Sequence, residues 1–273
     1  MLDVGVTISH GGASATICPF CGAGCSALLV DGTAYPRLHH PISQGALCLR
    51  GWSMGELARS PLRVDGAYLR NRGDPLRPAR FDKALEAAAS RLAAVRDAYG
   101  GASVGILGSA RITVEEVGML RRLARAVGTP HFDSLQRLGY LPFPPVDLRD
   151  LEVASRLTLL GTNLEERHPQ IARRTLRALD RGTEVRVVHA RRVSPATAGA
   201  GHFRVLPGHE LDEVPDAMEN EFLLVSSELA LCGRGGDAAD RLTGRSAMFL
   251  SDHVNQRGAV EAGLHPSLEG MSA

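Results

Sequence analysis

The pattern of apolar and polar residues predicts alternating strands and helices over most of the chain. From residue 81 onward, short apolar runs alternate with longer segments in which apolar residues recur every three or four positions. Short runs of this kind are typical of buried strands, and the longer recurrence is typical of amphipathic helices. The expected strands are 103–107, 157–160, 185–188, 203–206 and 248–250, and the expected helices are 81–98, 114–127, 169–181 and 211–224.

Two of the expected helices have well-defined ends. Thr113 is a favourable N-cap for the helix over 114–127, and Gly128 can end that helix. Pro169 fits the first turn of the next helix. Because strands alternate with helices, we expect an α/β fold whose body is a doubly wound, Rossmann-like parallel sheet covered on both faces. Ligands of such sheets bind beyond the carboxyl ends of the strands, where loops 108–112, 161–169 and 189–194 are expected.

The N-terminal part of the chain lacks this alternation. A short strand is expected at 27–30 and a short helix at 52–60, and the stretch 62–80 is rich in Gly, Pro and Arg and is typical of an extended linker. We therefore expect three parts, a tail over 1–16, a cysteine-containing domain over 17–63 and an α/β body over 64–273.

Composition and charge narrow the functional classes. The net charge is +1, so no excess of positive charge indicates a nucleic-acid partner or an acidic membrane surface. No segment approaches the roughly 18 consecutive apolar residues of a membrane-spanning helix. The first 16 residues contain no Lys or Arg and no long apolar run, unlike a signal peptide. We expect a cytoplasmic protein, in which closely spaced cysteines do not form disulfides.

Four of the five cysteines lie in the first 48 residues. Three of them occur in the run C-P-F-C-G-A-G-C, and the fourth begins the run C-L-R-G; they are Cys18, Cys21, Cys25 and Cys48. Gly22 and Gly24 allow the loop to curl so that its three thiols converge. Four thiolates can hold one [4Fe–4S] cluster or a tetrahedral zinc ion. We favour the cluster, because zinc ribbons usually contain two C-x-x-C pairs; a Cys₄ zinc site and unliganded thiols remain alternatives.

The cysteine spacing resembles that of the N-terminal iron–sulfur domain of molybdopterin oxidoreductases. Further similar segments are 63–85, 108–116, 161–169 and 255–266, and the combination is most similar to the formate dehydrogenase alpha subunit. The resemblance implies a small [4Fe–4S] domain followed by a truncated molybdopterin oxidoreductase body. It also implies that Arg50 lies where the family usually has a basic residue between cluster and pterin. Arg50 is then expected to serve as an electron relay near the cluster.

The chain departs from the family at the position of the catalytic metal. In the formate dehydrogenase pattern, the run corresponding to 132–140 carries the Cys or selenocysteine that binds molybdenum or tungsten, followed by a histidine. Here Gly139 and Tyr140 stand at those two positions, and glycine has no side chain that could bind a metal. The resemblance therefore implies a lost metal site, and we expect that the family's C-terminal pterin-binding domain is missing.

The pterin-binding loops are also altered. His189 stands where the family has an acidic residue suited to a guanine edge. By resemblance, the residues of vestigial pterin-binding loops would be Arg111, Asn163, His168 and Arg191. Cys232 lies in the run L-C-G-R-G-G and is expected to be an ordinary free thiol.

These observations lead to three functional hypotheses. The favoured one is an electron-transfer subunit with one [4Fe–4S] cluster, associated with a catalytic, formate dehydrogenase alpha-like partner subunit. Molybdopterin guanine dinucleotide is then expected on that partner and not on this chain. The alternatives are a structural or assembly subunit whose metal serves folding only, and a catalytic subunit resembling that of formylmethanofuran dehydrogenase. Whether this chain alone is an enzyme is left open.

Overall fold

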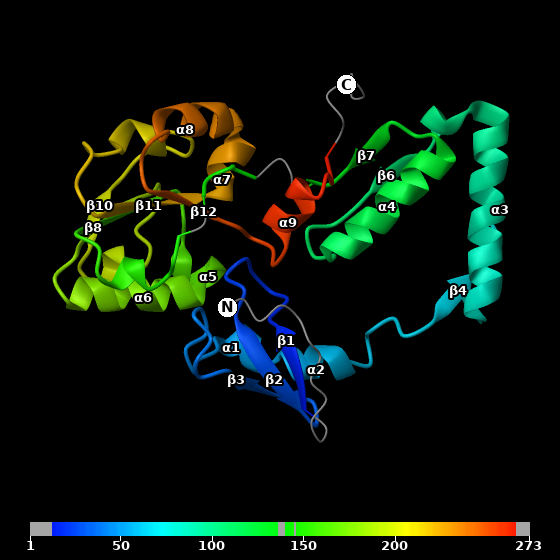
Figure 1. The fold of residues 1–273 in the computed structure, drawn as a ribbon, viewed down its shortest axis with the longest axis horizontal. Helices are drawn as coiled ribbons and strands as arrows, with labels where there is room; N and C mark the ends of the chain where they lie inside the picture. The colour runs from blue at the N-terminus through cyan, green and yellow to red at the C-terminus, as the bar shows by residue number, and fades with distance from the viewer. Residues whose placement is uncertain (1–12, 136–139, 145, 266–273) are drawn as a thin grey trace.

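The computed structural model describes residues 13–135, 140–144 and 146–265, which form three parts (Figure 1). The first is a three-stranded antiparallel sheet of β1 (Ala13–Ile17), β2 (Ser26–Val30) and β3 (Thr33–Pro36). The tight β2–β3 turn has positive φ at Asp31 (49°) and Gly32 (74°), as a two-residue hairpin loop requires. Two short helices follow, α1 (Leu49–Trp52) and α2 (Met54–Arg59). Residues 13–16, expected to be part of a tail, instead form most of β1.

The second part is a five-stranded sheet, here called the sheet lobe. Its strands lie in the order β10-β9-β8-β11-β12, and every neighbouring pair is parallel. Their bounds are β8 Arg156–Leu160, β9 Glu184–Val188, β10 Gly201–Phe203, β11 Glu221–Ser226 and β12 Ala247–Leu250. After β8 the chain continues to β9 on one side, and β11 later pairs on the other side of β8. The carboxyl ends of β8 and β11 therefore mark a topological switch point, where ligands of such sheets bind.

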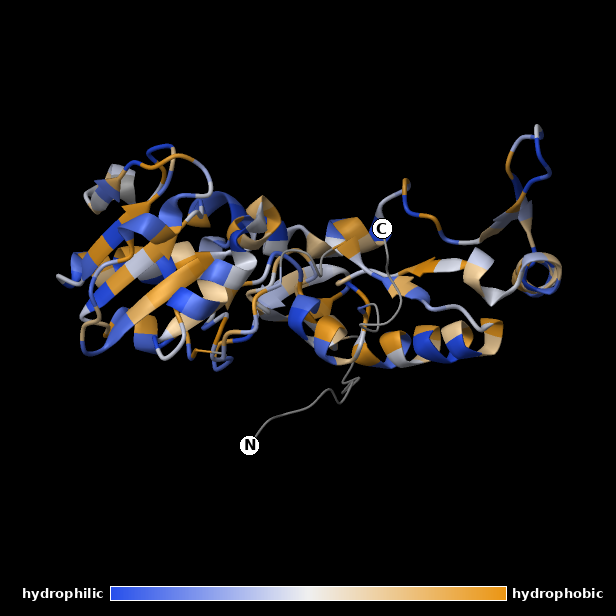
Figure 2. Ribbon diagram, turned by 90° about the horizontal axis from the view of Figure 1, so that it is seen from above, coloured by the Kyte–Doolittle hydropathy of each residue, from blue (hydrophilic) through white to orange (hydrophobic). Residues whose placement is uncertain are grey.

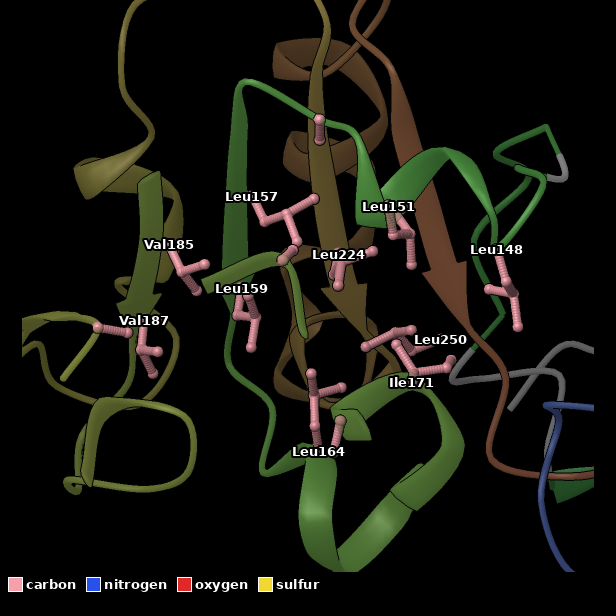
Figure 3. Close-up of a cluster of buried hydrophobic side chains, with 14 of the residues drawn as sticks. Leu148, Leu151, Leu157, Leu159, Leu164, Ile171, Val185, Val187, Leu224 and Leu250 are labelled. Atoms are coloured by element: carbon pink, nitrogen blue, oxygen red, sulfur yellow. The ribbon is translucent and has the colours of Figure 1, made fainter. Parts of the chain in front are cut away.

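Both faces of the sheet lobe are covered. Leu157 and Leu159 of β8 pack with Ile171 of α6 (Pro169–Asp180) in one buried cluster (Figure 3). Leu160 packs with Ala238 of α8 (Gly235–Arg241) in a second cluster. All five residues of β8 are buried, as expected for a central strand of a doubly wound sheet. The expected fold class is therefore confirmed.

The third part, here called the open lobe, lies at the other end of the molecule from the sheet lobe (Figures 1 and 2). Its elements are the hairpin β4 (Ala67–Leu69) and β5 (Arg77–Ala79), the long helix α3 (Phe81–Tyr99), the parallel pair β6 (Gly105–Leu107) and β7 (His131–Asp133), and helices α4 (Val114–Val127) and α9 (Gln256–Glu261). A small buried cluster joins α4, β7 and α9. No residue of α3 is buried in the part of the chain that the structure describes.

Shorter helical segments connect these elements. They are α5 (Leu164–Arg167), α7 (Ser227–Leu229), 3-10 turns at Gly101–Ser103, Asp150–Glu152, Ala196–Ala198 and Glu210–Glu213, and a π-helical turn at Ala230–Arg234. Among the described helices, none combines the length and the apolar character that crossing a membrane demands.

Most of the expected elements are confirmed; besides residues 13–16, which belong to β1 and not to a tail, three expectations are wrong. The stretch 211–224 is not a helix, because Pro215 interrupts it and its last apolar residues belong to β11. The strand expected at 203–206 ends at Phe203. The linker expected over 62–80 contains the hairpin of β4 and β5. Strand pairing decides the first and third cases, because β11 pairs with β8 and β12, and β4 pairs with β5.

Candidate metal centre

Four thiols line one cavity at the junction of the cysteine-containing domain and the sheet lobe. The wall of this cavity consists of Cys18, Phe20, Cys21, Cys25, Leu47, Cys48, Gly51, Pro169 and Gln170. Three of the thiols lie on the β1–β2 loop, and Cys48 directly precedes α1. The structure therefore brings all four sequence-predicted cysteines together. In the described part of the chain, no three His, Cys, Asp or Glu side chains are arranged to hold a single metal ion.

The β1–β2 loop is held in its shape by backbone contacts. The N–H of Cys18 donates to the carbonyl oxygen of Cys25 at 2.8 Å and closes the loop. The N–H of Gly22 donates to the carbonyl oxygen of Ser251 at 2.9 Å, and a Cβ at Gly22 would lie 2.1 Å from that oxygen. Gly24 has φ of +73°, which disfavours other residues. Glycine at 22 therefore permits the loop to dock against the segment after β12.

Burial controls the charge of these thiols. It raises the pKa of Cys18 and Cys21, and it raises the pKa of Cys25 to about 12, with the neighbouring cysteines adding to the effect for Cys25. Iron and zinc bind the thiolate form, so a bound metal must supply the positive charge that stabilises these thiolates, and its binding releases protons. The donor set of four sulfurs, mostly buried and surrounding one cavity, fits such a group.

Arg50 links the cavity to the sheet lobe. Its guanidinium donates to the carbonyl oxygens of Glu166 (3.1 Å) and Arg167 (2.9 Å) at the end of α5. Its charge also acts to lower the pKa of Cys21, against the larger effect of burial. Two backbone acceptors at the end of α5 thus hold the guanidinium on the side of the cysteine domain that faces the sheet lobe.

His168 lies next to the cavity wall and is fully buried. Its Nε2 forms a 2.8 Å hydrogen bond with the carbonyl oxygen of Ser251, the same oxygen that accepts from Gly22. Burial lowers the pKa of His168, so the ring is neutral. The contacts give this histidine a role in joining α6 to the segment after β12, close to the cysteine loop.

The remaining predicted site residues occupy loops at the carboxyl ends of strands. Arg111, after β6, donates to the carbonyl oxygen of Pro19 at 2.6 Å in the cysteine loop. Asn163, after β8, donates to Glu166 at 3.1 Å. Arg191, after β9, is exposed, and its N–H donates to His189 Nδ1 at 3.0 Å. Arg111 thus lies beside the candidate metal centre, whereas Arg191 does not line its cavity.

Two further predictions concern the lost metal site. Gly139 lies outside the described residues. The ring of Tyr140 packs edge-on against Phe249 with ring centroids 5.6 Å apart, and its hydroxyl donates to Glu261 at 3.4 Å. Cys232 is exposed and does not line the cavity.

One residue of the cavity wall was not singled out from the sequence. Gln170 is only 4% exposed and lies in the first turn of α6. Its Oε1 has no hydrogen-bond partner among the described residues. A buried glutamine immediately after the helix-starting Pro169 is the signal that could have identified it, because an amphipathic helix usually places an apolar residue at a buried position.

Comparisons with known proteins agree with this arrangement. Residues 13–60 match the molybdopterin oxidoreductase Fe4S4 domain, which supports a 4Fe–4S cluster as cofactor, and residues 63–208 match the molybdopterin oxidoreductase domain. The fold is similar to that of acetylene hydratase from Pelobacter acetylenicus, with a TM-score of 0.54 and 20% identity, covering 68% of this chain and 28% of that chain.

Curated relatives include formate dehydrogenase subunits. The alpha subunit of the F420-dependent formate dehydrogenase of Methanocaldococcus jannaschii is 31% identical over 211 residues, covering 71% of this chain and 30% of that protein. The alpha subunit of the F420-dependent formate dehydrogenase 1 of Methanococcus maripaludis is 32% identical over 211 residues, covering 71% of this chain and 31% of that protein. The chain thus spans about 30% of the length of these relatives. It belongs to the molybdopterin oxidoreductase family.

Proposed function

We propose that the protein is an iron–sulfur electron-transfer subunit of a formate dehydrogenase-type complex. Residues 17–63 form its cluster-binding domain, and residues 64–273 form its body. The observation that carries the proposal is that Cys18, Cys21, Cys25 and Cys48 all line one cavity. Among the described residues, no three of these side chains are arranged to hold a single metal ion, as a zinc site requires. A [4Fe–4S] cluster binds each of its four cysteines through a different iron and so accommodates sulfurs that lie further apart.

The surrounding residues supply what such a site needs. A bound [4Fe–4S] cluster accepts and releases one electron. Phe20 and Leu47 line the cavity and limit the access of water to it. Arg50 holds a positive charge near the thiols through two carbonyl contacts, and a nearby cation favours the more negative, reduced state. Arg50 therefore supplies a positive charge next to the cluster, on the side where the cluster meets the sheet lobe.

We propose that molybdopterin guanine dinucleotide and its metal lie on a catalytic partner subunit similar to formate dehydrogenase alpha subunits. The support is the glycine at 139, where the resemblance places the metal-binding Cys or selenocysteine. Electrons would then pass between that partner and this chain during formate oxidation or CO₂ reduction. The free cysteines fit a reducing compartment, so we place the protein in the cytoplasm.

Metal analysis tests the proposal. After anaerobic purification, we expect about four irons and four sulfides per chain and no molybdenum or tungsten on this chain. Zinc alone would indicate a structural or assembly role, and stoichiometric molybdenum or tungsten would indicate a catalytic subunit of the formylmethanofuran dehydrogenase type. Either result would overturn the proposal.

A pair of cysteine variants tests the ligand set. Cys48→Ala should lose the visible absorption of the cluster or convert the cluster to a form with fewer irons. Cys232→Ala is the matched control, because Cys232 is exposed and outside the cavity, and it should retain wild-type iron and absorption. An unchanged spectrum for Cys48→Ala would contradict the assignment of this residue as a ligand.

A further inference from the structure

The sheet lobe contributes a polar side chain to the wall of the thiol cavity. Gln170 lines the cavity together with all four cysteines and is 4% exposed. Its Oε1 has no hydrogen-bond partner among the described residues. Buried polar atoms are nearly always paired in folded proteins, so an amide with one end unpaired at the wall of a ligand cavity indicates that its pairing is completed only when the cavity is filled.

The end of α6 adds a second feature at the same wall. This 12-residue helix begins at Pro169, so its positive end lies at the cavity. The N–H groups of Ile171 and Ala172 both donate to the carbonyl oxygen of His168, and Pro169 has no N–H. The N–H of Gln170 has no acceptor within its own helix. The backbone N–H and the side-chain amide of Gln170 thus both belong to the end of α6 that lines the cavity, the end at which anions are favoured.

The chemistry of the cavity decides which end of the amide faces it. Thiolates and the sulfides of a cluster only accept hydrogen bonds. The oxygen and nitrogen of a glutamine amide exchange places when the end group rotates by half a turn, so either atom can face the cavity. An amide facing such a cavity therefore directs its NH₂ group toward the sulfurs.

We propose that Gln170 donates a hydrogen bond from its side-chain amide to a sulfur of the bound [4Fe–4S] cluster and thereby raises the reduction potential of the cluster. The inference rests on the proposed function, because it requires the cluster to be present. The reduced cluster carries one more negative charge, so the donor stabilises it more than the oxidised cluster. Gln170 is a positioning residue for electron transfer, supplied by the body and not by the cysteine domain.

The contacts of Arg50 and Gln170 differ in a way that separates their effects. Arg50 is already tied to two carbonyl oxygens, at 3.1 and 2.9 Å, and acts through its charge at a distance. Gln170 is uncharged and can act only through direct contact with a sulfur. Removing the Gln170 amide should therefore change the reduction potential of the cluster and also remove the exchangeable proton that the amide places next to a sulfur.

The test compares three variants in the purified, cluster-containing protein. Gln170→Leu keeps the approximate volume and removes the donor, and Gln170→Met keeps the length if the leucine variant fails to retain iron. Gln44→Leu is the matched control. It is the same substitution in the cysteine domain, at a residue that does not line the thiol cavity. Midpoint potentials come from anaerobic redox titration, and hyperfine spectroscopy of the reduced cluster in H₂O and D₂O detects exchangeable protons near it.

We expect both Gln170 variants to lower the equilibrium constant for reduction about tenfold, which is about 59 mV for one electron. They should also lose one exchangeable-proton coupling that the wild type and Gln44→Leu retain. Wild-type potential and couplings in a Gln170 variant with full iron would overturn the inference while leaving the proposed function intact. Zinc in place of iron in the wild type would overturn both.

Discussion

The sheet lobe and the open lobe are built from the same kinds of element, yet they differ sharply in burial. Every residue of β8 is buried, and helices cover both faces of its sheet. In the open lobe, α3 has no buried residue, and Tyr99 at its end is 78% exposed. Because burial of apolar surface is the main stabilising term, the free energy of unfolding is concentrated in the sheet lobe.

The cysteine domain depends on the sheet lobe and not on the open lobe for most of its support. Ser251, after β12, accepts hydrogen bonds from Gly22 and His168. Arg174 of α6 is fully buried and donates to the carbonyl oxygens of Pro41 (2.8 Å) and Ile42 (3.0 Å). The candidate metal centre is therefore set against the better packed region, which holds the geometry of the thiols.

Removal of Arg174 should have the largest effect. The guanidinium also pairs with Glu152 at 3.1 Å, so Arg174→Leu leaves a carboxylate and two carbonyls without this donor. We expect a loss of about 3–5 kcal/mol in the free energy of unfolding, measured by urea titration. Most of it comes from the two buried carbonyl oxygens, at about 1–3 kcal/mol each, because Glu152 keeps Arg181 at 3.1 Å. Arg177→Leu is the control, because Arg177 is 46% exposed and lies 3.7 Å from Glu152, and it should cost less than about 1 kcal/mol. Equal losses in the free energy of unfolding for the two variants would show that the burial of Arg174 does not determine its contribution to stability.

Matched leucine truncations compare the two lobes directly. Leu159→Ala removes a fully buried side chain from the centre of the sheet and should cost about 3 kcal/mol. Leu85→Ala, in α3, changes a side chain that is 59% exposed and should alter stability by no more than about 0.5 kcal/mol. Chemical denaturation of both variants measures the difference. A cost at Leu85 as large as at Leu159 would mean that a further surface covers α3.

The sequence allowed prediction of elements in both lobes but not of their burial. The periodic pattern located α3 and α4 as readily as α6, because an amphipathic pattern reports a helix whether or not a partner covers its apolar face. It failed over 211–224, where the run Phe222–Val225 belongs to β11 and becomes recognisable only through pairing with β8. Long-range pairing of this kind leaves no local signal.

The candidate metal centre was predictable in a similar, partial way. Cysteine spacing identified four thiols that the fold brings to one cavity. Gln170 and Ser251 could not be predicted as neighbours, because they reach the cysteine loop through the packing of α6 and β12. Tertiary contacts of this kind follow from the sheet order and not from spacing along the chain.

Acidification should weaken the contact between the sheet lobe and the cysteine loop. Burial lowers the pKa of His168, so the folded state favours the neutral ring. Stability from this group is present above the unfolded pKa of about 6.5 and falls below it, by at most about 1.4 kcal/mol per pH unit. Urea titrations at pH 7.5 and 5.5 should show a smaller decrease for His168→Gln than for the wild type. The same decrease in both would assign the pH dependence to other groups.

Loss of the cap of α4 should have the smallest effect and remain within the open lobe. Thr113 accepts from the N–H of Glu116 at 3.2 Å, and Glu116 accepts from the N–H of Thr113 at 2.8 Å, forming a capping box. Thr113→Ala should cost about 1 kcal/mol in the local stability of α4. Hydrogen exchange should then be faster by about fivefold at the first amides of α4 and unchanged in β8 and β11, because the two lobes open separately. Faster exchange in β11 as well would show that the lobes unfold as one cooperative unit, and the contrast in burial between them would not correspond to a contrast in stability.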